Sequence, residues 1–404
     1  MSERKIKIVN GTVITPYRMI KNGSVLITNG VITAINDADI TAADAIAIDA
    51  RGQYIAPGFI DIHVHGGGGH DFMDGSVAGF LKIAETHAHY GTTAMVPTTL
   101  TSDKGSLLDT LEVYEKAHRL NNVGSRFLGM HIEGPYFSLK QRGAQDARYI
   151  RDPDPAEYME ILEASSSIVR WSAAPEKAGA IQFGRVLRDR GILASVAHTD
   201  AVYDDMIEAF ENGYTLATHL YSAMSGVSRR NAFRYGGAVE SAFLIDEMDV
   251  EIIADGKHLP AELLKLVYKI KGPDRTALIT DAMRAAAMPS GKSVLGSLHD
   301  GTEVLVEDGV AKMPDRKAFA GSVATANQLV HNMVDMADIP LIDAVRMATA
   351  TPARIMGLGS QMGGIAVGKQ ADIVIFDKHI NIHTTMVGGS VVYQREQTTW
   401  KETI

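Results

Sequence analysis

Short runs of apolar, β-favouring residues recur eight times through the middle of the chain, separated by stretches with a helical period. In the stretches 106–118, 203–211 and 260–270, apolar residues return every three or four positions. Strands that alternate with helices imply parallel strands joined by crossover helices. Eight such units predict an α/β fold of the (β/α)8 TIM-barrel type. The predicted strands are Phe59–Val64, Thr92–Pro97, Phe127–Ile132, Val169–Ala174, Leu193–Ala197, Leu216–Thr218, Val250–Ala254 and Ala277–Thr280.

An open, doubly wound sheet is the alternative arrangement for alternating strands and helices. Such a sheet normally carries a G-x-G-x-x-G phosphate-binding turn after its first strand. The run Gly66–Gly69 after the first predicted strand does not match that spacing. The pattern therefore favours the barrel.

Both ends of the chain have a different texture, with short alternating strands and few helical stretches. Turns are predicted at Asn10-Gly11, Asn22-Gly23 and Asn29-Gly30, because Asn-Gly pairs favour tight hairpins. The segment from Gly364 to Tyr393 reads in the same way. We expect the two ends to build one small β-sandwich module together.

These patterns divide the chain into a module and a larger domain. The β module takes residues 1–56 plus 360–404, and the (β/α)8 domain takes residues 57–359. A further glycine-rich, β-like insertion is predicted near 290–317, after the eighth strand.

Composition narrows the classes of protein that fit. The 404 residues are 46% hydrophobic and 22% charged, as in ordinary globular proteins, and the net charge of −9 speaks against nucleic-acid binding. Cysteine is absent, so disulfides and thiolate metal sites are excluded, and any metal ligands must be His, Asp or Glu. The chain shows neither an apolar leader nor an apolar run of about 18 residues, which predicts a cytoplasmic protein without membrane contact.

Two histidines one residue apart end the first predicted strand. Residues i and i+2 of a strand project to the same face, so His63 and His65 point the same way, as metal ligands would. The glycines 66–69 that follow remove side-chain bulk and are expected to leave room for an ion and a substrate. Two histidines on a solvated strand face are the alternative reading of the pair.

Other potential ligands also fall where predicted strands end. These ends converge at one mouth of a barrel, where catalytic residues of this fold lie. Each residue alone could cap a neighbouring loop, but together they predict a metal site. They are His131, Glu133, His198, His219 and Asp281.

Motifs in this order and spacing resemble the amidohydrolase superfamily and, within it, the N-acetylglucosamine-6-phosphate deacetylase family. The resemblance covers nearly the whole chain, and the second, fourth and fifth motifs below are the more specific ones. The motifs are PGFIDIHVHG, HIEGP, AHT, THLYSAM, ADGKHL, LITDAM and AGS.

The resemblance implies a divalent metal centre with one or two ions per chain. Glu133, His198 and His219 would hold one ion, with Glu133 in place of the carboxylated lysine of many relatives. Some members of the family lack the strand-one histidines and use a single ion. Because this chain keeps His63 and His65, they would hold a second ion that Glu133 bridges to the first. Nitrogen and carboxylate ligands suit Zn, Fe, Mn or Co.

This arrangement suits the hydrolysis of an amide. A metal lowers the pKa of bound water to about 7 and can polarise a carbonyl oxygen. Asp281 would take the proton of the water and return it to the departing nitrogen, as base and then acid. Its alternative role is that of a further metal ligand, and it could serve in both.

The resemblance also implies contacts to a sugar phosphate. His258 and Arg230 would bind the phosphate, with Arg230 reaching across the interface of a homodimer; guanidinium suits phosphate oxygens. Arg229, Arg230 and Arg234 could instead form a solvated basic turn, and which of the three binds phosphate stays open. Other sugar-contacting positions are Ala144, Gln145, Ser222, Ala223, Phe319, Ala320 and Gly321.

Two positions depart from the pattern of the family. Ser222 stands where many relatives have Asn. Gln145 stands where many have a His that helps to polarise the carbonyl; glutamine can donate a hydrogen bond but carries no positive charge. These changes bear on sugar preference more than on the reaction.

The expected activity is the metal-dependent hydrolysis of the acetamide of N-acetylglucosamine 6-phosphate in amino-sugar catabolism. The alternatives are the same reaction on the galactosamine epimer, or the hydrolysis of a cyclic amide or an N-acyl amino acid. A non-catalytic scaffold is the most distant alternative, because such proteins usually lose ligands and this chain keeps them all.

Overall fold

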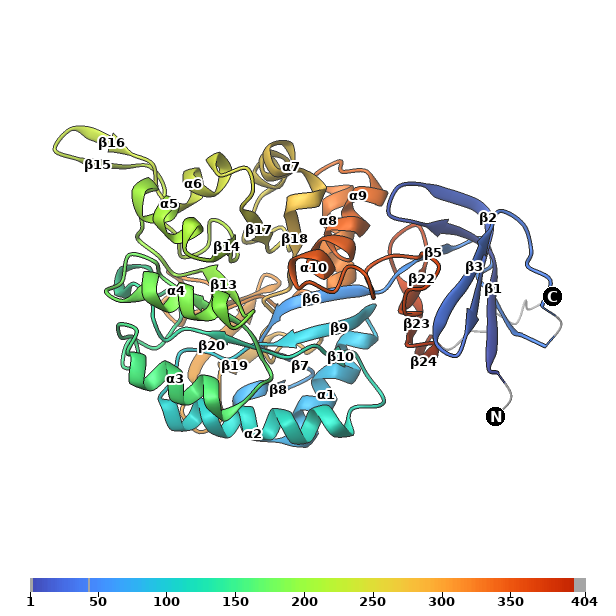
Figure 1. Cartoon of the computed structure of the whole chain (residues 1–404), viewed down its shortest axis with the longest axis horizontal. Coiled ribbons are helices and arrows are strands. Elements are labelled where there is room, and N and C mark those ends of the chain that lie inside the picture. The colour runs from blue at the N-terminus through green and yellow to red at the C-terminus, as the bar shows by residue number, and fades with distance from the viewer. Residues whose placement is uncertain (1–2, 43, 396–404) are drawn as a thin grey trace.

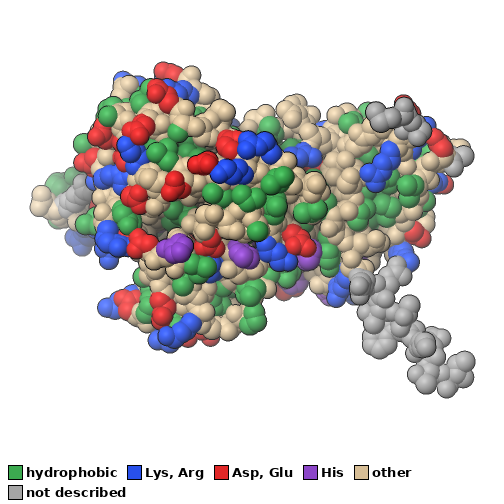
Figure 2. Space-filling view, turned by 90° about the horizontal axis from the view of Figure 1, so that it is seen from below, with side chains coloured by type: hydrophobic (Ala, Val, Ile, Leu, Met, Phe, Trp, Pro, Cys, Tyr) green, Lys and Arg blue, Asp and Glu red, His purple; other side chains and the backbone are tan. Residues whose placement is uncertain are grey.

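The computed structural model describes residues 3–42 and 44–395; positions 396–404 of the predicted β module lie outside the described residues. A large lobe of helices around parallel strands lies beside a smaller all-β lobe that contains the first and the last strands of the described residues (Figure 1). None of the described helices is long and apolar enough to cross a membrane. Acidic and basic side chains are interspersed on the face shown in Figure 2.

The parallel strands of the large lobe match the eight predicted positions to within about two residues. They form two hydrogen-bonded groups, in the orders β10-β9-β6 and β11-β12-β13-β14-β17-β18. The third predicted strand is divided in two where Gly129 interrupts it with a φ of 133°. The strands are β6 (Phe59–Val64), β9 (Thr92–Pro97), β10 (Arg126–Phe127), β11 (Met130–Glu133), β12 (Ile168–Ala173), β13 (Leu193–Val196), β14 (Tyr214–Ala217), β17 (Asp249–Ile252) and β18 (Thr276–Leu278).

Contacts at the strand ends join the two groups. A parallel bridge links Thr98 to His131 on one side. On the other side Asp281 N–H donates to the carbonyl of His63 at 2.9 Å. The buried carboxylate of Asp61 strengthens this second seam by accepting from the backbone N–H and the hydroxyl of Thr280. The ends of β6 and β18 are therefore held side by side, with His63, His65 and Asp281 at the junction.

Helices cover the outside of the parallel strands (Figure 1). Their inward faces carry the largest core cluster, in which Trp171 packs edge-on against Phe183 at 5.1 Å. Burying such aromatic side chains supplies a large share of the stabilisation of the lobe. The helices are α1 (Val77–Ala88), α2 (Lys104–Leu120), α3 (Pro155–Ala164), α4 (Ala180–Asp189), α5 (Tyr203–Glu211), α6 (Ala238–Leu244), α7 (Ala261–Arg275), α8 (Ala326–Asp335), α9 (Leu341–Met347) and α10 (Ala350–Ile355), with 3-10 turns η1 (Phe72–Asp74) and η2 (Leu139–Gln141).

The small lobe is a sheet of eight strands that both ends of the chain supply, which we call the terminal sheet. β5 pairs with β1 on one side and with β22 on the other, so N- and C-terminal segments meet at its centre. Apolar side chains from both segments, among them Ile55 and Ile373, form its own core. The strands are β1 (Lys5–Ile14), β2 (Met19–Thr28), β3 (Val31–Asn36), β4 (Ile46–Asp49), β5 (Tyr54–Pro57), β22 (Ile373–Phe376), β23 (Ile382–Val387) and β24 (Ser390–Gln394).

Two of the three predicted Asn-Gly turns are wrong. Asn10-Gly11 and Asn22-Gly23 lie inside β1 and β2, where the pairing register shifts. Both asparagines adopt left-handed backbone, with φ of 58° and 51°, so each accommodates a bulge and the strand continues. Only Asn29-Gly30 forms the expected turn, between β2 and β3.

Shorter strands decorate the large lobe. Three antiparallel strands between β18 and α8 occupy the segment where an inserted β structure is expected: β19 (Gly291–Leu295), β20 (Thr302–Glu307) and β21 (Val310–Lys312). β15 (Ser228–Arg230) and β16 (Phe233–Tyr235) form a hairpin that projects from the lobe at the upper left of Figure 1. β7 (Gly66–Gly67) and β8 (His70–Asp71) form a small hairpin after β6.

Candidate active site

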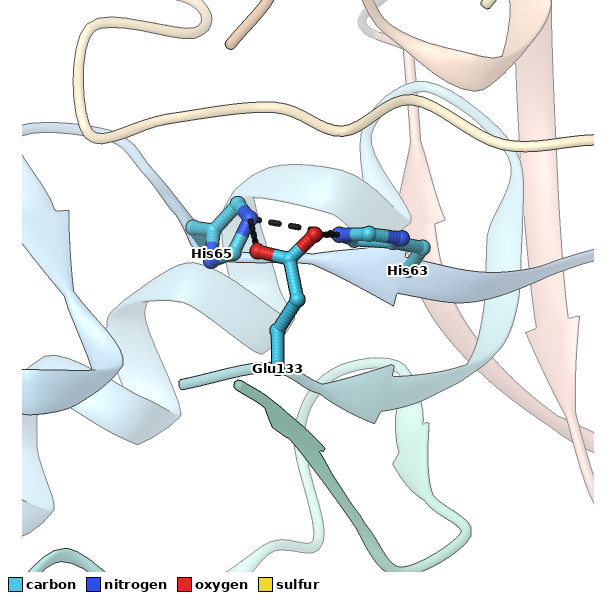
Figure 3. A group of neighbouring side chains, drawn as sticks. All are labelled: His63, His65 and Glu133. Carbon is cyan, nitrogen blue, oxygen red and sulfur yellow. Dashed lines mark hydrogen bonds and ion pairs between the residues drawn. The ribbon is translucent and has the colours of Figure 1, made fainter. Parts of the chain in front are cut away.

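Glu133, at the end of β11, is the centre of the predicted metal site. It belongs to two groups of potential ligands whose donor atoms all lie within 4.8 Å of one another: His63 with His65, and His198 with His219. All five side chains are buried. Figure 3 shows the carboxylate of Glu133 between the rings of His63 and His65. Residues from four strand ends thus meet at one carboxylate, as the sequence predicts.

Donor separations in the first group fit a metal ion. Bonds of about 2.0–2.1 Å in a tetrahedral array place neighbouring donors roughly 3.3 Å apart. The Nε2 atoms of His63 and His65 are 3.3 Å apart, and each lies 3.4–3.5 Å from a Glu133 oxygen. Asp281 Oδ1 completes the set at 3.5 Å from His63 Nε2 and 3.1 Å from His65 Nε2.

The second group is oriented by backbone carbonyls. His198 Nδ1 is 3.0 Å from the carbonyl of Gln141, and His219 Nδ1 is 3.1 Å from the carbonyl of Ser222. When each Nδ1–H donates to its carbonyl, Nε2 keeps a free lone pair. Those Nε2 atoms lie 3.4 and 3.2 Å from Glu133 Oε1. Glu133, His198 and His219 thus form a second group of three potential ligands.

Three of these residues have an uncommon backbone. His198, His219 and Asp281 adopt left-handed φ values of 46°, 32° and 47° directly after their strands. Such a conformation costs an L-residue of this kind on the order of 1 kcal/mol. In this conformation the side chains of His198 and His219 lie against Glu133. That of Asp281 lies against His63 and His65.

Electrostatics keep the two carboxylates of the site ionised. Burial alone would raise the pKa of Glu133, but His63, His198 and His219 outweigh it and hold that pKa well below the usual range. Burial alone would also raise the pKa of Asp281. His65 and His63 outweigh burial, so the pKa of Asp281 lies below its usual value. Two carboxylates among imidazole nitrogens form the kind of ligand set that divalent Zn, Fe, Mn or Co accepts.

An ion pair that sequence reasoning missed lies directly beneath this centre. The side chains of Arg170 and Glu251 are completely buried and form a bidentate pair. Arg170 uses its remaining N–H groups on Ser195 Oγ, the carbonyl of Ile62 and Thr218 Oγ1. Every guanidinium donor is therefore satisfied, and five strands are tied together.

Arg170 contacts the residues that precede two of the potential metal ligands in the sequence. Ile62 precedes His63 and Thr218 precedes His219, while Glu251 Oε2 lies 3.8 Å from His63 Nδ1. Beside it, His131 bonds to Ser172 Oγ at 2.6 Å and has its pKa held well below the usual range by burial and by Arg170. His131 is thus a neutral member of the interior, and the structure does not bring it into either ligand group.

A cavity of about 370 Å³, here called the main cavity, opens over the ligands. His65, Glu133, His198, His219 and Asp281 line its floor. The predicted substrate contacts that also line it are Ala144, Gln145, Ser222, Ala223, His258, Phe319 and Gly321. Ala320 does not line it; this residue is fully buried and its N–H donates to the carbonyl of Ala311.

His258 is held in place by an aspartate that the sequence does not single out. Its Nδ1 lies 2.8 Å from Asp255 Oδ2, and its ring packs against Phe319 with 4.8 Å between centroids. Nε2 remains as its polar atom for a ligand. The ADGKH motif contains this aspartate three residues earlier, which is the local signal that could have found it.

Gln145 makes two hydrogen bonds with its amide. Its Nε2 donates to Glu133 Oε2 at 2.7 Å, and its Oε1 accepts from the backbone N–H of Thr101 at 2.8 Å. The amide is therefore locked beside the shared carboxylate.

The predicted phosphate-binding arginines lie on the β15–β16 hairpin, away from the main-cavity lining. Arg229 pairs with Arg234 across the hairpin, and Arg230 with Phe233. The side chain of Arg230 is outside what the structure describes. The exposed fraction of Phe233 is 73%, so the hairpin offers an uncovered surface.

The glycines after His65 serve a different purpose from the one expected. A Cβ at Gly66 would lie 2.3 Å from the carbonyl oxygen of His70, and one at Gly68 would lie 2.3 Å from Thr86 Oγ1. At Gly67 it would meet the ring of His87. The run allows the chain to fold back tightly on itself and on α1; it does not line the main cavity. The expectation of room for ion and substrate is wrong at these positions.

The chain belongs to the amidohydrolase family, whose model matches residues 54–392. Within that family it is similar to an N-acetylglucosamine-6-phosphate deacetylase from Lysinibacillus sphaericus, with 32% identity over 86% of this chain and 87% of the relative. It is also 30% identical to an N-acetylgalactosamine-6-phosphate deacetylase from Escherichia coli O157:H7, over 90% of this chain and 93% of the relative. The resemblance read from the motifs is confirmed.

A solved structure gives the same result. A variant of N-acetyl-D-glucosamine-6-phosphate deacetylase from Mycobacterium smegmatis, in complex with N-acetyl-D-glucosamine-6-phosphate, superposes with a TM-score of 0.89 at 30% identity. The match covers 97% of this chain and all of the other. The amidohydrolase-type α/β fold with an additional β region is thereby established for this chain.

Breaking the buried pair should destabilise the protein more than removing it. Arg170→Met leaves the Glu251 carboxylate buried without its cation, which typically costs about 3–5 kcal/mol. The double variant Arg170→Met, Glu251→Leu removes both charges, and its free energy of unfolding should fall clearly less. Equilibrium urea unfolding, followed by tryptophan fluorescence and circular dichroism, measures the difference. Equal losses in the single and double variants would contradict a coupled pair.

Proposed function

We propose that the protein is a metal-dependent hydrolase that converts N-acetylglucosamine 6-phosphate and water to glucosamine 6-phosphate and acetate. The observation that carries the proposal is the meeting of two three-ligand groups at Glu133, beneath a cavity that also contains His258 and Gln145. Relatives with this activity in their names cover most of the chain. The reaction belongs to amino-sugar catabolism, and a cytoplasmic location stays a prediction.

A divalent ion in this site would supply a strongly acidified water molecule and polarise the amide carbonyl. The residues of the chain then have distinct tasks. Asp281, ionised and at the floor of the main cavity, accepts the proton of the attacking water and delivers it to the leaving nitrogen. The second N–H of the Gln145 amide is directed by its two hydrogen bonds and serves as a neutral donor for the acetamide oxygen.

Asp281→Asn should abolish most of the turnover while the protein stays folded. Asparagine has the same size but cannot accept and return the proton, so kcat should fall by roughly a hundredfold to ten-thousandfold. Release of acetate from N-acetylglucosamine 6-phosphate measures it. Asp338→Asn, an exposed aspartate paired with Lys265, is the matched control and should keep full activity. Near-normal turnover in Asp281→Asn would assign the proton transfer to another group.

The same assay separates the alternative functions. A parallel assay with N-acetylgalactosamine 6-phosphate tests activity on the galactosamine epimer, the substrate in the names of some relatives. Cyclic amides and N-acyl amino acids test the broader family. If the metal-loaded protein hydrolyses no amide, the result supports the hypothesis of a non-catalytic scaffold.

We infer that the centre holds two ions, because His63 and His65 form a ligand group with Glu133 in addition to the group of Glu133, His198 and His219, and lie beside Asp281. Elemental analysis after reconstitution with excess Zn, Mn or Co and gel filtration should approach two ions per chain. His63→Asn should lower that value toward one. His383→Asn, a histidine of the terminal sheet, is the matched control and should leave it unchanged. A plateau at one ion in both the native protein and His63→Asn would exclude the second site.

We also propose the complete architecture that the sequence predicts. The eight parallel strands close as a (β/α)8 barrel over residues 57–359, supported by the Thr98–His131 bridge and the Asp61–Thr280 seam. Residues 1–56 plus 360–404 form the β-sandwich module, supported by the separate core of the terminal sheet.

We propose further that the phosphate is bound by His258 and by Arg230 of a second copy in a homodimer. The hairpin that carries Arg230 projects from the lobe with Phe233 exposed, as a segment that reaches a partner would (Figure 1). His258 lies in the main cavity, where a dianion on an acidic protein needs a local cation.

Mixing two inactive variants tests whether Arg230 is shared. Arg230→Ala and Asp281→Asn chains should each be weak, but a mixed dimer has one site with both native groups, so activity should return after subunit exchange. Arg190→Ala, a substitution at the end of α4, is the matched control for Arg230→Ala. This control variant should be fully active on its own, without subunit exchange. Demonstrated exchange without recovery would place Arg230 in the site of its own chain or outside any site.

A further inference from the structure

The two ring nitrogens of His63 have different surroundings. Nε2 lies 3.4 Å from a Glu133 oxygen, while Nδ1 lies on the side of the ring that faces away from Glu133 (Figure 3). The side chain is completely buried, and Nδ1 has no hydrogen-bond partner within the described part of the chain. His198 and His219 differ, because their Nδ1 atoms lie 3.0 and 3.1 Å from backbone carbonyls. The ring of His63 is therefore not oriented in the way that those two rings are.

The carboxylate of Glu251 faces this nitrogen. Glu251 Oε2 lies 3.8 Å from His63 Nδ1, and both side chains are completely buried. A charge-assisted N–H···O bond is about 2.8 Å long, so the ring and the carboxylate need to approach by roughly 1 Å to form one. Leaving a buried N–H without an acceptor is costly, which favours that approach.

Arg170 keeps the Glu251 carboxylate in place for this contact. Its guanidinium bonds to both carboxylate oxygens, with 2.9 Å between Nη2 and Oε2. Burial alone would raise the pKa of Glu251, but Arg170 and His63 outweigh burial and lower that pKa, so Glu251 stays ionised. An ionised carboxylate has about four lone-pair sites, so Oε2 can accept a second bond. Glu251 is thus an anion with acceptor capacity left beside His63.

We propose that Glu251 is a positioning residue for the ion that His63 and His65 would hold. The inference rests on the proposed function and its two-ion centre. By accepting the Nδ1–H of His63, Glu251 leaves the lone pair of Nε2 free for the ion, fixes the orientation of the ring and makes it a stronger ligand. Loss of such a partner typically lowers metal affinity about 10–100-fold.

Stepwise zinc binding measures this role without an assay of turnover. Metal-free protein is titrated with Zn²⁺ in competition with a chromophoric chelator, and the step that is lost in His63→Asn belongs to the ion of His63. Glu251→Gln keeps the size of the side chain but removes the charge and replaces one oxygen by an N–H donor. His63 then faces either that donor or a neutral oxygen, whose bond is about half as strong. The dissociation constant of the His63 step should rise about 10–100-fold, and the other step should not change.

Ser195→Ala is the matched control. It removes the bond from Arg170 Nε to Ser195 Oγ and so disturbs the same buried network, but it keeps Glu251 beside His63. Both zinc steps should therefore stay as in the native protein. An unchanged His63 step in Glu251→Gln would overturn the inference. Equal weakening of both steps, or the same loss in Ser195→Ala, would also overturn it, because general damage to the interior explains either result.

A measurement on the native protein keeps the inference testable if Glu251→Gln does not fold. In the zinc-loaded protein, proton NMR should show a ring N–H signal far downfield, as expected for an imidazole that donates to a carboxylate. This signal should be absent from His63→Asn. If no downfield signal depends on His63, Glu251 does not accept its proton and the inference is wrong.

The outcomes separate this inference from the proposals on which it rests. Absence of acetate release from a protein with both zinc steps intact would overturn the proposed hydrolysis alone. A single zinc step that His63→Asn retains would overturn the two-ion centre and this inference with it. Two native zinc steps that Glu251→Gln leaves unchanged would overturn this inference alone.

Discussion

The buried pair of Arg170 and Glu251 is the interaction on which the arrangement of the site depends. A charge in the interior is tolerated only when every one of its hydrogen-bonding groups is satisfied. Arg170 meets this condition with five donors directed at groups on β6, β13, β14 and β17. Because these groups have fixed positions on their strands, the strands cannot shift relative to one another without leaving a donor unpaired.

The ligands inherit this rigidity through the backbone. His63 and His219 each follow a residue that Arg170 holds, and Glu133 lies between their rings. Asp61 adds a second constraint from the other side, since it joins the strand of the histidine pair to the residue before Asp281. A metal centre needs donors placed to within a few tenths of an ångström, and these polar contacts can hold them better than apolar packing alone.

The parallel strands and most candidate ligands could be predicted from the sequence because both depend on local patterns. Apolar runs mark the strands, and the carboxyl ends of parallel strands converge, so His198, His219 and Asp281 were expected near His63. Arg170 and Glu251 could not be found in this way. They are 81 residues apart and read as isolated charges in apolar strands; only the folded interior brings them together.

Glycine and asparagine were the least reliable guides. Asn10 and Asn22 show that left-handed backbone permits a bulge as readily as a turn, and the paired neighbour that decides between them is distant in sequence. Glycine is required at positions 66 and 68 because the carbonyl oxygen of His70 and the hydroxyl of Thr86 leave no room for a Cβ there. The left-handed conformations of the ligands themselves carry no local signal either.

The terminal sheet has a consequence for the order in which the molecule can assemble. β5 is made early on the ribosome, yet its partner β22 begins at Ile373, more than three hundred residues later. Until the C-terminal segment emerges, one edge of β5 has no partner and part of the core around Ile55 has no cover. An unpaired edge of this kind invites association with other chains. Pairing of such remote segments is also slow. The terminal sheet can therefore be completed only after the segment that contains β22, β23 and β24 has been synthesised and has left the ribosome.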